Sequence, residues 1–165
     1  MTEVIEVKTR RELGDFIGLP YRLYRRDPNF VAPLRAQIRD ILTGKGNVLF
    51  NYGPHALLLC RRQGKTVGRI LVGIDETYNR QNGYQSAWIS LFECEKNEET
   101  AKALMQACED WALQHGAEYL RGPEPPDNGE NFKGILVMGF DGPPAMMNSY
   151  NPPWYGEFFE QQGFV

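Results

Sequence analysis

A short polar segment between two regular elements carries the side chains whose types could support chemistry. Residues 87–92 are rich in β-forming residues, and the chain then turns polar through Glu93 and Lys96 before a helix predicted over residues 97–115. Asn97 is a good N-cap, and two glutamates follow it in the first turn. A helix N-terminus at the carboxyl end of a strand is a common place for anionic ligands to bind. The segment therefore predicts a ligand site, although it does not yet name a reaction.

The elements around this segment must hold it in place. The helix has apolar residues at the spacing of one buried face, namely Ala101, Leu104, Met105, Cys108, Trp111 and Ala112. Residues 117–121 then resume as a strand. A strand, a helix and a second strand of these lengths predict two parallel strands joined by a right-handed crossover.

The N-terminal half predicts a strand, three helices and a hairpin. Thr9 and Glu12 have the spacing of a capping box at the start of the first helix, and Pro20 suits the first turn of a second. The predicted helices cover residues 10–17, 20–26 and 33–42, and the predicted strands cover residues 4–8, 56–61 and 65–74. With the C-terminal elements, which end in a helix over residues 154–162, this order predicts a mixed α/β sheet.

Residues 122–153 are the least regular part of the chain and hold seven of its eleven prolines. Within them, residues 135–138 fit either a short strand or a buried plug. A long proline-stiffened loop beside a cleft is often functional, and the alternative is a rigid lid that only packs. Both interpretations remain open.

Composition excludes several classes of protein. The 165 residues form a single domain, and a net charge of −3 gives no general attraction to nucleic acid, although residues 1–45 are basic. No apolar run reaches membrane-spanning length, so we expect no membrane partner. The three cysteines lack CxxC spacing, which favours a reducing, cytoplasmic setting, and the histidines stand alone, so we expect no metal.

Several strings in this order resemble the GNAT superfamily of acyl-CoA N-acyltransferases. Residues 65–70 (KTVGRI) are similar to its G-x-x-V-G hairpin strand, residues 88–121 to its acyl-CoA core, and residues 159–164 (FEQQGF) to its Y-E-x-x-G-F ending. More narrowly, FVAPL, RGP, GFDGPP and YNPPWY look like a GNAT-like branch of bacterial proteins. The resemblance covers essentially the whole chain and implies the order β-α-α-β-β-β-α-β-α.

The resemblance implies transfer of an acyl group from acetyl-CoA or another acyl-CoA to a small-molecule amine. A backbone N–H near Leu91 and Phe92 would polarise the thioester carbonyl. Lys96, Asn97 and Thr100 occupy the place of the superfamily's pyrophosphate loop, usually Q/R-x-x-G-x-G/A. Here that stretch has no glycine and carries three glutamates, which oppose an anionic ligand by about 1–3 kcal/mol. Capping carboxylates with no cofactor role explain it equally well.

A tyrosine in the final helix commonly protonates the leaving thiolate in this superfamily, but the matching position here is Phe159. Tyr155, one turn earlier, and Tyr150 are the available substitutes if the insert reshapes the cleft. Glu93 at the strand end is the candidate general base, since partial burial raises a carboxyl pKa. Cys94 is a possible acyl acceptor, although a buried structural thiol explains it better.

Three interpretations follow. The first is an N-acyltransferase with a degenerate pyrophosphate loop, and the second is a non-catalytic ligand-binding or protein-interaction domain. In the third, the insert binds something other than CoA, with Tyr150, Asn151 and Trp154 as substrate residues beside Tyr155. In the superfamily, strands follow the G-F ending, so we expect a fold lacking the usual C-terminal strands. The chain would then be part of a longer protein, or a homodimer partner or missing C-terminal half would cover the sheet edge.

Overall fold

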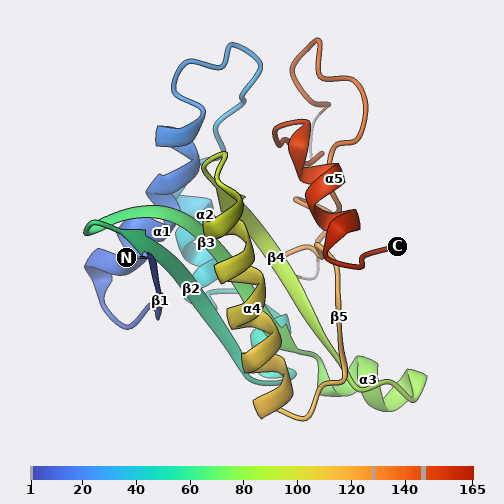
Figure 1. The fold of residues 1–165 in the computed structure, drawn as a ribbon. Coiled ribbons are helices and arrows are strands. Elements are labelled where there is room, and N and C mark those ends of the chain that lie inside the picture. Colours follow the sequence, from blue (N-terminus) through green and yellow to red (C-terminus); the bar gives the residue numbers. More distant parts are fainter. Residues whose placement is uncertain (1, 128, 146–147) are drawn as a thin grey trace.

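The computed structural model describes residues 2–127, 129–145 and 148–165, which form one mixed sheet with helices on both faces (Figure 1). In these residues the sheet has the strand order β1-β2-β3-β4-β5, antiparallel except for the parallel pair β4–β5. The strands are β1 (Thr2–Glu6), β2 (His55–Arg62), β3 (Lys65–Ile74), β4 (Ser86–Cys94) and β5 (Tyr119–Arg121). The helices are α1 (Arg10–Leu23), α2 (Arg35–Leu42), the 3-10 turn η1 (Val48–Asn51), α3 (Glu76–Asn82), α4 (Glu98–Gln114) and α5 (Trp154–Gln161). The predicted mixed α/β fold and its parallel crossover are confirmed.

Alternation along the strands divides the core into two apolar layers. On β2, Leu58 and Cys60 face one layer with α4 and α5, whereas Leu57 and Leu59 face the other with α1 and α2. Successive side chains of a strand point to opposite faces, so a strand buried on both faces is apolar at every position. Figure 1 shows α4 crossing one face of the sheet, with α1 and α2 behind it.

Helix α1 continues through Pro20, and the predicted break into two helices is wrong. The capping box at its start is present, with Thr9 Oγ1 accepting from Glu12 N at 3.2 Å and Glu12 Oε2 accepting from Thr9 N at 2.9 Å. Proline removes one N–H donor from the helix, which leaves the carbonyl of Phe16 without its usual partner. A buried side chain from the sheet, Arg69, donates to that carbonyl at 2.7 Å. This tertiary contact therefore offsets the hydrogen bond that α1 loses at Pro20.

Helix α4 buries the predicted apolar face, with one correction. Leu104, Met105 and Cys108 are fully buried, but Trp111 is only half-buried and stacks on His115 with ring centroids 3.9 Å apart. Trp111 packs only partly against the core, whereas Ala112, the next residue, is buried in it. Close packing of α4 on the sheet explains the glycine at position 68 of β3. A Cβ on Gly68 would lie only 2.6 Å from Leu104 Cδ1.

A helix that the sequence analysis did not predict lies between β3 and β4. The polar connection over residues 75–85 contains α3, whose N-cap Asp75 accepts from Tyr78 N at 2.8 Å. Residues 135–138 form neither a strand nor a fully buried plug, since Ile135 packs against the core while Val137 and Met138 are exposed. No helix in the described part of the chain is long and apolar enough to span a membrane.

Strands β4 and β5 diverge toward their carboxyl ends. Their parallel register runs from Ser86↔Tyr119 to Trp88↔Arg121, and one further hydrogen bond follows, from Glu124 N to Ile89 O at 2.7 Å. Beyond this point each strand turns toward different neighbours. The gap is filled by the insert and by α5, whose side chains line a cavity there.

Candidate active site

The candidate site is a cavity of about 90 Å³ where β4 and β5 separate. Strand β4 contributes Leu91, Phe92 and Glu93 to its wall, and α5 contributes Tyr155. The remaining wall comes from the segment between α1 and α2 and from the proline-rich insert. Segments distant in sequence therefore meet at the strand end that the sequence marked as a ligand site.

A bulge in β4 shapes the floor of the cavity. The register between β3 and β4 passes from Leu71↔Ser90 to Arg69↔Glu93, so β4 contains one residue more than β3 over this interval. Leu91 has a φ of 52°, a left-handed conformation that costs a branched side chain energy. Bulges turn backbone groups out of the ladder and are frequent beside active sites. Leu91 and Phe92, whose backbone the resemblance predicts to contact a thioester, both line the cavity.

Glu93 is the ionisable group at the centre of the site. Its Oε2 accepts hydrogen bonds from the phenols of Tyr24, the C-cap of α1, and, at 3.2 Å, of Tyr155 on α5. Burial raises the pKa of Glu93 from 4.5 to about 7, while the positive charge of Arg69 and the two phenols limit the rise. A carboxyl group poised near neutral pH can take up a proton and release it again, as a general base must.

Tyr155 connects Glu93 to the backbone of β4. Its hydroxyl accepts the N–H of Cys94 at 2.8 Å and lies within hydrogen-bond distance of Glu93. Burial, and then the charge of Glu93, raise the pKa of Tyr155 well above 10, so the phenol keeps its proton at neutral pH. Phe159, one turn later on α5, packs edge-on against Phe92 with ring centroids 5.3 Å apart and is not a cavity-lining residue.

Two site residues were missed from the sequence, Tyr24 and Arg69. Arg69 is buried, lies opposite Glu93 in the β3–β4 register and lines the cavity. Its Nε has no hydrogen-bond partner among the residues that the structure describes, and burial lowers its pKa. A lone arginine in the apolar run of β3 was a signal that could have identified it. Tyr24 offered no such signal, because it follows an exposed helix end.

Of the three residues predicted to bind substrate, two line the cavity and one lies outside it. Tyr150 lines the cavity, and its hydroxyl donates to Asp27. Asn151 also lines it, but its amide is engaged with Leu136, accepting from N at 2.7 Å and donating to O at 3.1 Å. Trp154 lies outside the cavity and lines an adjoining groove of about 510 Å³. Tyr150 is thus the best placed of the three to touch a ligand in the cavity.

Cys94 is buried, and its thiol donates to Glu95 O at 2.9 Å. Burial raises its pKa, which opposes formation of a nucleophilic thiolate. The arrangement supports the structural interpretation of this cysteine. In the described residues no group of histidine, cysteine and carboxylate side chains is arranged to hold a metal ion.

Comparison with solved structures identifies this architecture. A tandem GNAT protein from the clavulanic acid biosynthesis pathway superimposes with a TM-score of 0.63 at 13% identity, over 99% of this chain and 43% of that one. A putative acetyl transferase from Pyrococcus furiosus gives 0.56 at 14% identity, over 100% and 93%. The ribosomal-protein-alanine N-acetyltransferase of Brucella melitensis gives 0.53 at 14% identity, also over 100% and 93%. The chain has the GNAT fold.

Relatives in sequence are longer than this chain. It is 36% identical over 163 residues to the bacterial ceramide synthase of Caulobacter vibrioides, covering 98% of this chain and 42% of the relative. It is 29% identical over 159 residues to protein YghO of Escherichia coli, covering 94% and 39%. The chain spans about two fifths of the length of these curated relatives. No family model matches it.

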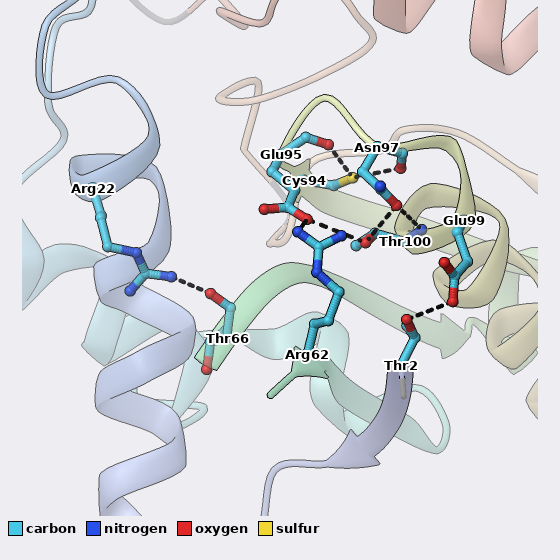
Figure 2. A network of polar contacts seen from close by, with 9 residues as sticks. All are labelled: Thr2, Arg22, Arg62, Thr66, Cys94, Glu95, Asn97, Glu99 and Thr100. Atoms are coloured by element: carbon cyan, nitrogen blue, oxygen red, sulfur yellow. Dashed lines mark hydrogen bonds and ion pairs between the residues drawn. The ribbon is translucent and has the colours of Figure 1, made fainter. Parts of the chain in front are cut away.

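The loop between β4 and α4 is where a GNAT protein would cradle the pyrophosphate of CoA, and Figure 2 shows how its groups are used here. Asn97 Oδ1 accepts from Thr100 N at 2.9 Å and from Thr100 Oγ1 at 3.0 Å. Glu95 forms an ion pair with Arg62 at the end of β2. Asn97 and Thr100 therefore cap the helix and use their hydrogen-bonding groups on each other. Of the three predicted loop residues, only Lys96 is exposed.

The surface beside this loop is acidic. A groove of about 340 Å³ runs between the start of α4 and α5 and is lined by Lys96, Glu98 and Glu157 among others. An ion pair with Lys102 at 2.6 Å lowers the pKa of Glu98 and keeps it ionised, and Glu99 accepts from Thr2 (Figure 2). A capped helix start with carboxylates around it does not fit a pyrophosphate, since like charges repel. The described residues of this loop therefore do not form the glycine-rich pyrophosphate cradle that the resemblance implied.

Proposed function

We propose that this chain is a GNAT-fold acyltransferase domain that moves an acyl group from a thioester to an amine. The observation that carries this proposal is the buried contact of Glu93 with Tyr155 at the divergence of β4 and β5. It combines a carboxyl group whose pKa is about 7 with a phenol that stays protonated. These are the base and the acid that aminolysis of a thioester needs.

In the proposed reaction the amine nitrogen bonds to the thioester carbonyl carbon, and the carbon–sulfur bond breaks. Glu93 takes the proton that the nitrogen loses, and Tyr155 gives its proton to the departing sulfur. The proton on Glu93 then passes to the tyrosinate along their 3.2 Å hydrogen bond, which restores both groups. The products are an amide and a thiol.

Two neighbours support this chemistry. The β4 bulge at Leu91 turns backbone away from the ladder toward the cavity, where an N–H near Leu91 or Phe92 would stabilise the oxyanion. Tyr24, which donates to the same carboxylate oxygen as Tyr155, holds the Glu93 carboxyl in place. Arg69 keeps the pKa of Glu93 from rising beyond neutral pH.

The amine is proposed to carry a long alkyl chain. The relative with 36% identity is named a ceramide synthase, and a ceramide is the amide of a fatty acid and a long-chain amino alcohol. Aromatic and proline side chains from α1 and from both neighbouring loops line the cavity, namely Pro20, Phe30, Pro33, Phe132 and Pro144. For the donor we commit to an acyl thioester, with acyl-CoA as the first to be tested.

A second candidate is a non-catalytic GNAT-like domain that binds a ligand or a protein. The observation that favours it is the loop before α4, where Asn97 satisfies Thr100 and acidic side chains surround the helix start. A domain that no longer binds an acyl donor would retain the cavity for another ligand.

Release of free thiol from acetyl-CoA and from palmitoyl-CoA, with sphinganine and with a short amine as acceptors, tests the proposal. Glu93→Gln and Tyr155→Phe should each lower the rate by about a hundredfold or more, because each removes one proton-transfer step. Glu118→Gln, an exposed carboxylate beyond α4, is the matched control and should retain the full rate. Thiol release that both site variants retain would refute the mechanism. No thiol release with any pair, together with direct binding of sphinganine, would favour the second candidate.

A further inference from the structure

Two loops project beside each other from the end of the molecule where the cavity opens. Residues 24–34 connect α1 to α2, and residues 129–145 belong to the insert; both extend beyond the sheet at the top of Figure 1. Each carries apolar side chains in solvent, with Val31 63%, Leu34 73%, Val137 67% and Met138 77% exposed. Large side chains this exposed, on neighbouring loops, indicate a surface that meets something apolar.

The two loops are fixed to one another. Asn29 Nδ2 donates to Phe140 O at 3.3 Å, and Tyr150 donates to Asp27. Rings of Tyr24, Phe30 and Tyr150 pack together beneath them, with centroids 4.7 to 6.0 Å apart. The cavity lies between the loops, since its lining includes Val31 from the first and Pro144 from the second. The two loops that carry the exposed side chains therefore also form part of the cavity wall, and Val31 belongs to both sets.

Positive charge accompanies these tips. Arg25 and Arg26 precede Val31, Arg35 and Arg39 follow Leu34, and all four are exposed. Among the described acidic groups of these segments, Asp40 pairs with Lys45 and Glu130 pairs with Lys133. Asp27, which accepts from the neutral phenol of Tyr150, and Asp141 then stand against the four arginines. This end is basic in a chain whose net charge is −3.

We propose that this end of the domain docks on an anionic lipid surface. Arginines beside exposed aliphatic side chains are the pattern of interfacial membrane binding, in which the apolar groups enter the headgroup region and the cations meet acidic lipids. An acidic protein would satisfy the arginines but would leave four exposed aliphatic tips unexplained. Docking in this orientation would open the cavity to the lipid, so that a long-chain amine could reach Glu93 without crossing water; this second step rests on the proposed function. The proposed docking replaces the expectation, drawn from the sequence, that the chain has no membrane partner.

Co-sedimentation with vesicles tests the docking without any activity measurement. The chain should bind vesicles of phosphatidylcholine with phosphatidylglycerol, and bind pure phosphatidylcholine vesicles at least about tenfold more weakly. The double variant Arg25→Glu with Arg26→Glu should lose at least about tenfold in affinity for the anionic vesicles, and so should Leu34→Ser with Met138→Ser. Circular dichroism checks that each variant remains folded.

Matched controls lie elsewhere on the surface. Arg10→Glu with Arg11→Glu makes the same charge change at the opposite end of α1, and Leu113→Ser removes a 67% exposed leucine on α4. Both should bind vesicles as the unmodified chain does. Equal losses in the loop variants and the controls would overturn the proposal, as would absent vesicle binding. A concentration-dependent dimer that Leu34→Ser with Met138→Ser dissociates, with no vesicle binding, would assign the surface to a second copy instead. Glu93→Gln should bind vesicles normally, so loss of catalysis and loss of docking are separable.

Discussion

The titration of Glu93 offers a test of the site that does not depend on a substrate. Burial raises the pKa of this carboxyl from 4.5 to about 7. At pH values between these two, the folded chain holds a proton that the unfolded chain has released. The free energy of unfolding is therefore highest, as far as Glu93 contributes, below about pH 4.5. It falls as the pH rises from there through about 7. Each pKa unit corresponds to about 1.4 kcal/mol, so the free energy of unfolding should fall by about 3 kcal/mol over this range from Glu93 alone.

Glu93→Gln removes the titration while keeping the shape of the side chain. We expect the free energy of unfolding of the variant, relative to that of the unmodified chain, to rise by about 3 kcal/mol between about pH 4.5 and about pH 8. Urea denaturation across this pH range measures it, and subtraction cancels every other titrating group. Glu118→Gln, with the same chemical change at an exposed position, should show a nearly constant difference.

A constant difference for Glu93→Gln as well would show that the carboxyl titrates near its ordinary value, and the reasoning about burial would be refuted. The same pKa predicts the activity profile. If Glu93 is the base, the rate of acyl transfer should rise with pH through about 7, since the base is active when deprotonated.

Three further predictions concern packing, the acid and the cofactor loop. Leu104→Ala should lower the free energy of unfolding by about 2–5 kcal/mol, and half-buried Trp111→Ala by only about 1–2 kcal/mol, as measured by chemical denaturation. Tyr155→Phe should cost about 1–3 kcal/mol of stability besides its effect on the rate, because the N–H of β4 that its hydroxyl accepts would be left buried and unpaired. Acetyl-CoA should bind weakly, and Glu98→Lys with Glu157→Lys should tighten binding about tenfold and make it more sensitive to salt, as followed by calorimetry.

Each of these has an outcome that contradicts it. A larger loss for Trp111→Ala than for Leu104→Ala would mean that the buried face of α4 is misassigned. An unchanged free energy of unfolding for Tyr155→Phe would mean that the Tyr155 hydroxyl does not accept the N–H of Cys94 on β4. Submicromolar binding of acetyl-CoA by the unmodified chain would contradict the account of the acidic groove. Asp110→Lys, near the other end of α4, serves as the charge control for the last experiment.

Local signals in the sequence determined much of this fold. The capping box of Thr9 with Glu12 and the cap at Asn97 depend on residues three positions apart, so the sequence predicts them directly. The parallel pair β4–β5 followed from the lengths of a strand, a helix and a strand, because a crossover of that size leaves few alternatives. Glu93 was selected as a candidate from its position at a strand end, and Tyr155 from the resemblance to a family with a tyrosine in its final helix.

Only the tertiary structure decided what those candidates do together. Sequence spacing cannot show that Tyr24, Tyr155 and Arg69 surround one carboxyl, because they come from three elements that meet only after folding. Pro20 illustrates the same limit: its cost to α1 was predictable, but the guanidinium that takes over the carbonyl of Phe16 lies 53 residues further along the chain. A pKa reports burial and nearby charge, and both are properties of packing rather than of residue order. The chemistry of Glu93 is therefore set by the fold, although the residue itself was visible in the sequence.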